Sequence, residues 1–146
     1  MRTVFADTAY WIALLNPKDE LHERAQEVSK SLGAIRIFTT EMVLVELLNY
    51  FANPKANNRA RADRRKAATA LAKTVRDDPN VTVIPQTSIQ FREGLKLYED
   101  RPDKAWTQTD CCSFKVMEKY RIREALTYDK HFEQAGFVAL LREDDE

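Results

Sequence analysis

Short apolar runs with the character of buried β-strands alternate along this chain with longer helical segments. The expected strands are residues 3–6, 35–38, 81–84, 125–127 and 137–141. The expected helices are residues 9–15, about 20–31, 40–51, 59–76, about 88–98 and 107–120. Strands that alternate with helices in this way build a parallel sheet covered by helices. The predicted fold class is therefore α/β, a three-layer α/β/α arrangement around a parallel sheet.

The chain has the length of one ordinary domain. Its 146 residues are enough to bury a core without disulfides or a structural metal. It contains only three glycines and five prolines, which favours long regular elements over disorder or a β-sandwich. We find no internal repeat and no linker. We therefore expect a single domain over residues 1–141, followed by an acidic, solvated tail at residues 142–146.

Charge is unevenly distributed in a chain whose net charge is zero. Residues 55–76 hold eight basic residues and one acidic residue, a net charge of +7. The apolar stripe of the helix expected there leaves Arg61, Arg65 and Lys66 facing largely outward. These three side chains are candidates for binding RNA phosphates beside an acidic site, which would otherwise repel its substrate. A merely solvated helix face is the other interpretation, because charge runs usually mean only that.

The cysteines and the N-terminal residues indicate in which cellular compartment the protein is expected. Cys111 and Cys112 are adjacent, so they suit neither a disulfide nor a zinc site, and we expect them in the core of a helix as reduced thiols. Asp7 interrupts the first apolar run, which argues against a signal peptide. No apolar stretch approaches the roughly 20 residues needed to cross a bilayer. The expected location is the cytoplasm, with no membrane contact.

Two acidic residues stand where expected strands end. Asp7 follows residues 3–6, and Asp129 follows residues 125–127. Ligands of open α/β sheets bind beyond the carboxyl ends of the strands, so acids at these positions point towards the usual site. Each also has a purely structural interpretation. Asp7 suits a helix N-cap, and Asp129 suits a turn.

Two further acids lie on helices that begin at the same edge. Glu46 interrupts an otherwise apolar helix, which should be buried, so its carboxylate must be paired, neutral or bound to a metal. A partly buried salt bridge is the structural alternative. Asp110 stands three residues after Thr107, the spacing of a capping box, although a helix N-terminus also favours the ionised carboxylate that a metal needs.

Four converging carboxylates would repel one another strongly unless a cation lay among them. Hard oxygen ligands without histidine or cysteine favour Mg²⁺ or Mn²⁺ over zinc. Ser113 lies one turn beyond Asp110 on the same helix face and is positioned to hydrogen-bond the site. His131 lies two residues beyond Asp129, close enough to touch substrate, although a structural role suits its position equally.

With these residues in hand, the chain resembles the PIN-domain family, particularly the VapC-like toxins and their solitary relatives. The resemblance covers nearly the whole chain. Each motif is weak alone, but their order and spacing are fairly specific. The segments that carry it are residues 4–8 (VFADT), 40–48 (TEMVLVELL), 106–111 (WTQTDC), 126–132 (LTYDKHF) and 133–137 (EQAGF).

The resemblance implies a divalent-metal-dependent ribonuclease, with RNA as substrate, Mg²⁺ or Mn²⁺ as cofactor, an antitoxin as possible partner and a two-fold homodimer. It implies that Asp7, Glu46 and Asp110 are core metal ligands and catalytic residues, and that Asp129 completes or replaces a second site. Thr8, Thr107 and Ser113 are expected to support them. The sequence departs from the family pattern at Ala9, where a polar residue is common, and at Thr107, where serine is usual.

Other protein classes fit less well. A haloacid-dehalogenase-type phosphatase needs a second aspartate at the position of Ala9, and a receiver domain needs a different acid pattern. The alternative that stays open is a catalytically silent PIN domain that binds RNA or protein. The sequence leaves open which RNA is cut, whether an antitoxin exists, and whether one or two metal ions bind.

Overall fold

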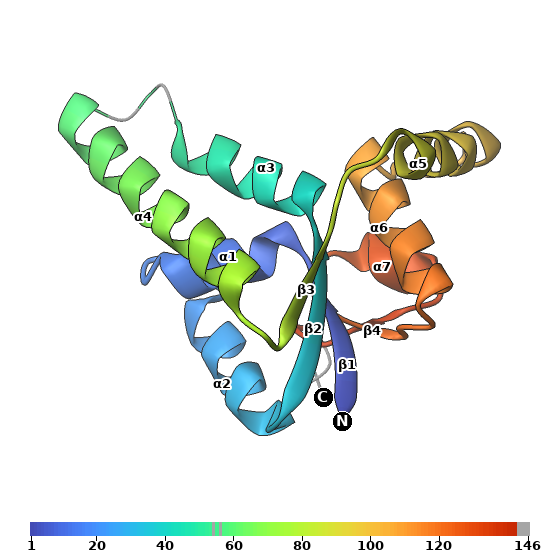
Figure 1. Cartoon of the computed structure of the whole chain (residues 1–146), viewed down its shortest axis with the longest axis horizontal. Helices are drawn as coiled ribbons and strands as arrows, with labels where there is room; N and C mark the ends of the chain where they lie inside the picture. Colours follow the sequence, from blue (N-terminus) through green and yellow to red (C-terminus); the bar gives the residue numbers. More distant parts are fainter. Residues whose placement is uncertain (54, 56, 143–146) are drawn as a thin grey trace.

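The computed structural model describes residues 1–53, 55 and 57–142. Twelve elements follow one another along these residues (Figure 1). The strands are β1 (Arg2–Ala6), β2 (Ile35–Thr40), β3 (Val81–Ile84), β4 (Glu124–Leu126) and β5 (Val138–Ala139). The helices are α1 (Thr8–Leu15), α2 (His22–Leu32), α3 (Glu41–Phe51), α4 (Asn58–Asp77), α5 (Ser88–Asp100), α6 (Gln108–Lys119) and α7 (Lys130–Gln134).

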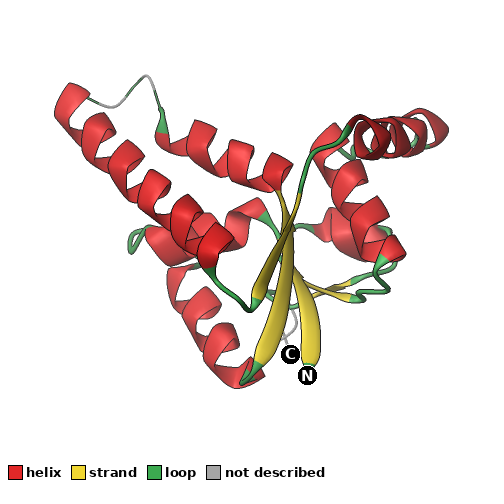
Figure 2. Ribbon diagram, in the orientation of Figure 1, coloured by secondary structure: helices red, strands yellow, loops and turns green. Residues whose placement is uncertain are grey.

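The five strands form one sheet in the order β3-β2-β1-β4-β5, and every neighbouring pair is parallel. The chain moves outward from β1 to β2 and β3, then crosses back to β4 and β5 on the other side. Crossovers between parallel strands are right-handed, so this reversal sends the later helices to the opposite face. Helices α1 to α4 cover one face and α5 to α7 cover the other (Figures 1 and 2). The predicted three-layer α/β/α class is confirmed.

The core lies where β1 is covered on both faces. Val4, Phe5 and Ala6 have no exposed surface, as a central parallel strand requires. Cys111 and Cys112 are buried free thiols, as predicted. No helix among the described residues is long and apolar enough to span a membrane. Burial of the β1 residues Val4, Phe5 and Ala6 fixes the end of this strand, and with it the position of the next residue, Asp7.

Three local predictions were wrong. The sequence interpretation gave no helix after Asp129, where the structure has the short helix α7. The last strand is β5, two residues long, because only residues 138 and 139 pair with β4 at the sheet edge. Helix α3 is not buried all round, since the side chains of Val45 and Tyr50 are about half exposed. It packs mainly against α4 and α1, and nothing in the described chain covers its outer face.

The predicted tail is described only at its first residue. Arg142 donates to the carbonyl oxygen of Tyr128 and pairs with the Glu133 carboxylate at 3.2 Å. Its guanidinium lies over the Tyr128 ring, 4.8 Å from the centroid. Residues 143–146 lie outside the described residues.

Candidate active site

The site lies at the carboxyl edge of the sheet, between β1 and β4. These neighbouring strands are where the strand order reverses, because β1 leads outward to β2 while the return crossover arrives at β4. The Asp7 backbone N–H bonds to the carbonyl oxygen of Leu126 at 3.2 Å, which ties the two strand ends together. A reversal of this kind leaves a crevice beyond the strand ends, where open α/β sheets bind ligands.

All four acids singled out in the sequence line one cavity in this crevice. Two come from strand ends, one from the second turn of α3 and one from the first turn of α6, and both helices start at this edge of the sheet (Figure 1). The residues lining the cavity are Asp7, Thr8, Ala9, Ile12, Glu46, Thr107, Asp110, Asp129 and His131.

Asp7, like Asp110, is a buried acid. Its Oδ1 accepts from the Thr8 backbone N–H, and its Oδ2 accepts from the Thr127 hydroxyl, each at 2.8 Å. Burial raises its pKa to about 7, against the lowering effect of these two hydrogen bonds, and the nearby charges of Asp110 and Asp129 raise it further. The buried negative charge of Asp7 is therefore unfavourable, and either a proton or a bound cation would stabilise this carboxyl group at neutral pH.

Asp110 is held by a capping box at the start of α6. The Thr107 hydroxyl accepts from the Asp110 backbone N–H, and Asp110 Oδ2 accepts from the Thr107 backbone N–H, both at 3.0 Å. The structural prediction for this residue is thus confirmed. Burial raises the pKa of Asp110, as does the charge of Asp129, whereas Thr107 and His131 lower it. The cap therefore fixes Asp110 Oδ2, in a residue that lines the cavity.

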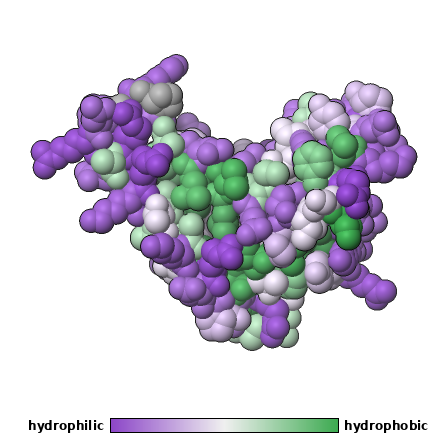
Figure 3. Space-filling model, turned by 45° about the horizontal axis from the view of Figure 1, so that its top comes forward, coloured by the Kyte–Doolittle hydropathy of each residue, from purple (hydrophilic) through white to green (hydrophobic). Residues whose placement is uncertain are grey.

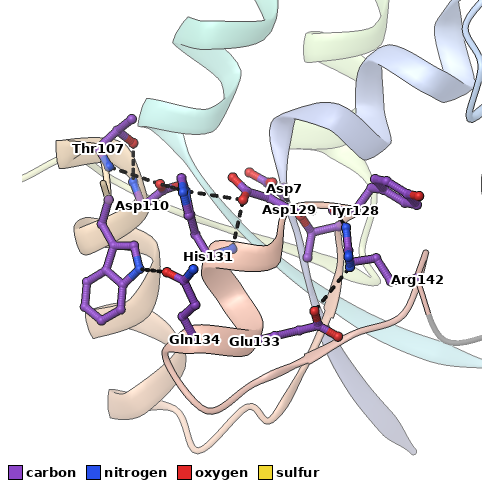
Figure 4. A network of polar contacts seen from close by, with 11 residues as sticks. Asp7, Thr107, Asp110, Tyr128, Asp129, His131, Glu133, Gln134 and Arg142 are labelled. Atoms are coloured by element: carbon purple, nitrogen blue, oxygen red, sulfur yellow. Dashed lines mark hydrogen bonds and ion pairs between the residues drawn. The ribbon is translucent and has the colours of Figure 1, made fainter. Parts of the chain in front are cut away.

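His131 links Asp110 to Asp129. Its Nδ1 lies 3.1 Å from Asp110 Oδ2 and 3.2 Å from Asp129 Oδ1 (Figure 4). Asp129 also caps α7, since its Oδ1 accepts from the His131 backbone N–H at 2.9 Å. Each of the three side chains offers a ligand atom, and these atoms all lie within 4.8 Å of one another. The sequence placed His131 near the site but did not place it among the acids.

Glu46 lies at the margin of the cavity. Its Oε1 accepts from the Thr8 hydroxyl at 2.8 Å. The expectation of a buried Glu46 was wrong, because the side chain is only partly buried on a helix with an open outer face. Its carboxylate is not part of the compact Asp110–Asp129–His131 group. The Thr8 bond nevertheless connects Glu46 to the residue that holds Asp7.

Only some of the remaining predicted site residues contact the four acids. Thr8 and Thr107 bond directly to the acids, as described above. Ser113 is buried in α6 and makes no hydrogen bond to any of the four carboxylates in the described chain. Arg61, Arg65 and Lys66 lie on α4 and do not line the cavity.

Thr127 is the residue that sequence reasoning missed. It is fully buried, and its hydroxyl both donates to Asp7 Oδ2 and accepts from the Asp129 backbone N–H at 3.0 Å. The sequence did contain a signal for it. Thr127 is a polar residue at the end of an otherwise apolar expected strand, two residues before Asp129, so its hydroxyl could have been expected to bond to the acids at that edge.

The donor set fits a divalent cation. Within the described chain, no lysine or arginine forms an ion pair with any of the four acids, and His131 is the only basic partner of Asp110 and Asp129. Partly buried carboxylates without cationic partners are unfavourable unless they are protonated or bind a metal. Oxygen ligands of this kind suit hard divalent ions.

An acidic cavity at the reversal point of a parallel α/β sheet is typical of proteins that bind a divalent cation beyond the strand ends. The family model described as "PIN domain" matches residues 4–138, and the chain belongs to this family. The resemblance inferred from the sequence is thereby confirmed. PIN nucleases use divalent metal, which agrees with the donor set found here.

Known relatives agree with this assignment. The chain is 31% identical over 135 residues to the 23S rRNA-specific endonuclease VapC20 of two Mycobacterium tuberculosis strains, covering 92% of this chain and 95% of VapC20. The crystal structure of VapC20, described as a sarcin-ricin loop cleaving toxin, superposes with a TM-score of 0.79 at 27% identity, covering 92% of this chain and 96% of that one. FitAcB from Neisseria gonorrhoeae shares the fold, with a TM-score of 0.60 at 16% identity over 93% and 94% of the chains.

Proposed function

We propose that this protein is a divalent-metal-dependent endoribonuclease of the VapC-like toxin type, acting in the cytoplasm. The observation that carries the proposal is the convergence of Asp7, Asp110 and Asp129 on one cavity without a lysine or arginine partner in the described chain. Kinship with VapC20, an rRNA endonuclease, supports the same activity. The silent-domain alternative would give no reason to keep these acids unpaired.

The proposed metal ligands are Asp7, Glu46, Asp110 and Asp129, with Mg²⁺ or Mn²⁺ as the ion. When bound, the ion lowers the pKa of a water molecule and offsets charge on the phosphate. The chain's own residues prepare the ligands. Thr8 and Thr127 orient the two oxygens of Asp7, and Thr107 orients Asp110. Because these bonds already exist, the carboxylates need little rearrangement when a cation binds.

The substrate class we propose is an exposed loop of ribosomal RNA. VapC20 is specific for 23S rRNA, and the chain matches it over nearly its full length. Metal-activated water would leave a 5′-phosphate and a 3′-hydroxyl. The supporting roles of Thr8 and Thr107, and phosphate binding by Arg61, Arg65 and Lys66, belong to this same proposal. Ser113 is left out of it, because in the described chain it bonds to none of the four carboxylates.

A homodimer and an antitoxin complete the proposed assembly. Apolar side chains lie exposed on two helices that flank the site, and Figure 3 shows areas of apolar surface on the corresponding face. They are Val45, Leu48 and Tyr50 on α3, and Ile89, Phe91, Leu95 and Tyr98 on α5. Exposed apolar residues that gather on one helix face are typical of protein interfaces. We assign the apolar groups on α3 and α5 to contact with a second copy of the chain.

Cleavage of purified ribosomes tests the proposal directly. Protein incubated with 70S ribosomes and Mg²⁺ or Mn²⁺ should cut 23S rRNA at one or a few loops, which primer extension maps to the nucleotide. Excess EDTA should abolish cutting. Intact rRNA under every metal condition would contradict the proposal and favour the silent domain. Co-expression with the gene upstream of this one, if it rescues cell growth, identifies the antitoxin.

A further inference from the structure

The His131 imidazole occupies the space between two proposed metal ligands. Its Nδ1 is 3.1 Å from Asp110 Oδ2 and 3.2 Å from Asp129 Oδ1 (Figure 4). The side chain is 20% exposed, so one side of the ring still faces the cavity, which it helps to line. The residue thus stands inside the acidic group and not beside it.

The ring is held there by its own backbone. The His131 N–H donates to Asp129 Oδ1 at 2.9 Å, which fixes the first turn of α7 against the acid. The next residue, Phe132, is fully buried and stacks edge-on against Phe114 of α6, with ring centroids 5.0 Å apart. Because α6 also carries Asp110, this contact packs the helix of His131 against the helix of Asp110.

The spacing of these atoms matches neighbouring ligands of one metal ion. Bonds of about 2.1 Å at right angles, as in an octahedral site, place adjacent ligand atoms about 3.0 Å apart. The two separations from Nδ1 are close to that value. Asp110 Oδ2 and Asp129 Oδ1 each accept one backbone N–H bond, so each of these oxygens keeps a second lone pair for the same ion.

We propose that His131 Nδ1 is itself a ligand to the divalent metal, together with Asp110 and Asp129. The inference rests on the proposed function, since it concerns the ion that the nuclease would use. An imidazole nitrogen suits transition metals, whereas Mg²⁺ favours oxygen alone. The site therefore has mixed nitrogen and oxygen ligation and prefers Mn²⁺ over Mg²⁺ more strongly than carboxylates alone would. This replaces the sequence-based expectation of a site without histidine.

The competing role for His131 is hydrogen-bond donation. A protonated Nδ1 would bridge the two carboxylates and orient them without touching the metal. Asparagine separates the two roles, because its amide N–H can take the place of the Nδ1–H donor but it has no imidazole nitrogen. In His131→Asn, the ratio of Mn²⁺ to Mg²⁺ affinity measured by calorimetry at fixed pH should fall by at least about tenfold, the lower range for losing even a supporting partner of a metal site. An unchanged ratio would overturn the proposal.

Pulsed electron paramagnetic resonance gives a readout that does not depend on activity. Mn²⁺ bound to the protein labelled with ¹⁵N-histidine should show coupling to an imidazole ¹⁵N nucleus. The assignment is clean because the chain contains two histidines, and the other, His22, has its Nδ1 2.6 Å from the carbonyl oxygen of Ala13. The coupling should persist in His22→Gln and vanish in His131→Asn.

The outcomes separate this inference from the proposed function. Bound Mn²⁺ without histidine coupling would overturn His131 ligation and leave the metal-dependent nuclease standing. Coupling that survives in His131→Asn would overturn the ligation as well. Failure of wild-type protein to bind Mn²⁺ at millimolar concentration would overturn both.

Discussion

The Thr127 hydroxyl donates a 2.8 Å hydrogen bond to Asp7 Oδ2 from the end of the neighbouring strand. The Thr127 hydroxyl oxygen also accepts a hydrogen bond from the Asp129 backbone N–H, at 3.0 Å. One buried hydroxyl therefore sets the orientation of one proposed ligand and the path of the chain into another. This linkage exists only because β1 and β4 are adjacent and parallel, with Ala6 paired to Leu126.

Replacing Thr127 tests that linkage. Thr127→Val keeps the side-chain shape but leaves a buried carboxylate oxygen without its donor, which costs about 1–3 kcal/mol. We expect weaker Mn²⁺ binding and slower cleavage, while the fold measured by circular dichroism is kept. Thr127→Ser restores the hydroxyl and should recover both. Equal loss in the serine and valine variants would indicate a packing role instead.

The amide substitutions should rank Asp110, Asp129 and Glu46. Asp110→Asn should reduce cleavage by more than about 100-fold, the upper range for losing only a supporting partner of a metal site. Asp129→Asn should be similarly severe, because both acids belong to the compact group with His131. Glu46→Gln should be milder, since Glu46 lies at the partly exposed margin. The exposed Asp77→Asn is the matched control, and single-turnover rates at saturating metal give the ranking.

This ranking differs from the one that the sequence alone favours, and the reason is physical. Asp7 and Asp129 could be placed because each follows an apolar strand, and strand ends share one edge of a parallel sheet. The burial of Glu46 was overestimated because an apolar helix gives no sign of which face the monomer leaves uncovered. The position of His131 could not be found, because α7 has five residues and too few turns to show a period.

Acidity should act on the metal-free protein through Asp7. Its pKa is raised from the ordinary 3.8 to about 7, chiefly by burial, so the folded state holds this proton more tightly than the unfolded state. The contribution of Asp7 to stability is therefore fully present below the unfolded pKa, falls as pH rises, and is lost above about 7. Denaturant unfolding in EDTA between pH 5 and 8 should show this decline relative to Asp7→Asn. Parallel curves for the two proteins would contradict it.

Metal affinity should rise with pH over the range in which the stability of the metal-free protein falls. An ion competes with the Asp7 proton, so binding below pH 7 releases protons and the apparent affinity rises with pH up to about 7. Calorimetry at pH 6 in buffers of different ionisation enthalpy measures the number of protons released. We expect a smaller release in Asp7→Asn. The same number in both proteins would assign the proton to another group.

Self-association should depend on the exposed apolar residues of α3 and α5. Leu48 and Leu95 are 38% and 47% exposed, and a glutamate at either position would place a charge in the proposed interface. Leu48→Glu and Leu95→Glu should convert a dimer to a monomer in light scattering at micromolar concentration. Val138→Glu, at an exposed apolar position on the edge strand β5, is the control and should stay dimeric. A wild-type monomer at these concentrations would refute the dimer outright.

The basic face of α4 gives the last prediction. Arg65 and Lys66 are exposed, Arg61 is partly buried, and none of the three lines the acidic cavity, so any effect on RNA must act at a distance or on flanking nucleotides. Each lost contact to a single-stranded phosphate should reduce the slope of log affinity against log salt by about 0.7. Changing Arg61, Arg65 and Lys66 together to glutamine should therefore weaken RNA binding and flatten the salt slope by about 2.

The matched control removes the same charge elsewhere. Lys18, Lys30 and Arg36 are exposed and lie outside α4, and their triple glutamine variant has an identical net charge. Single-turnover cleavage at saturating RNA should stay near wild type in both triple variants, because neither set touches the four acids. If the two variants weaken RNA binding equally, only net charge matters. If the α4 variant alone keeps wild-type RNA binding, then α4 is a solvated face or a surface for a protein partner.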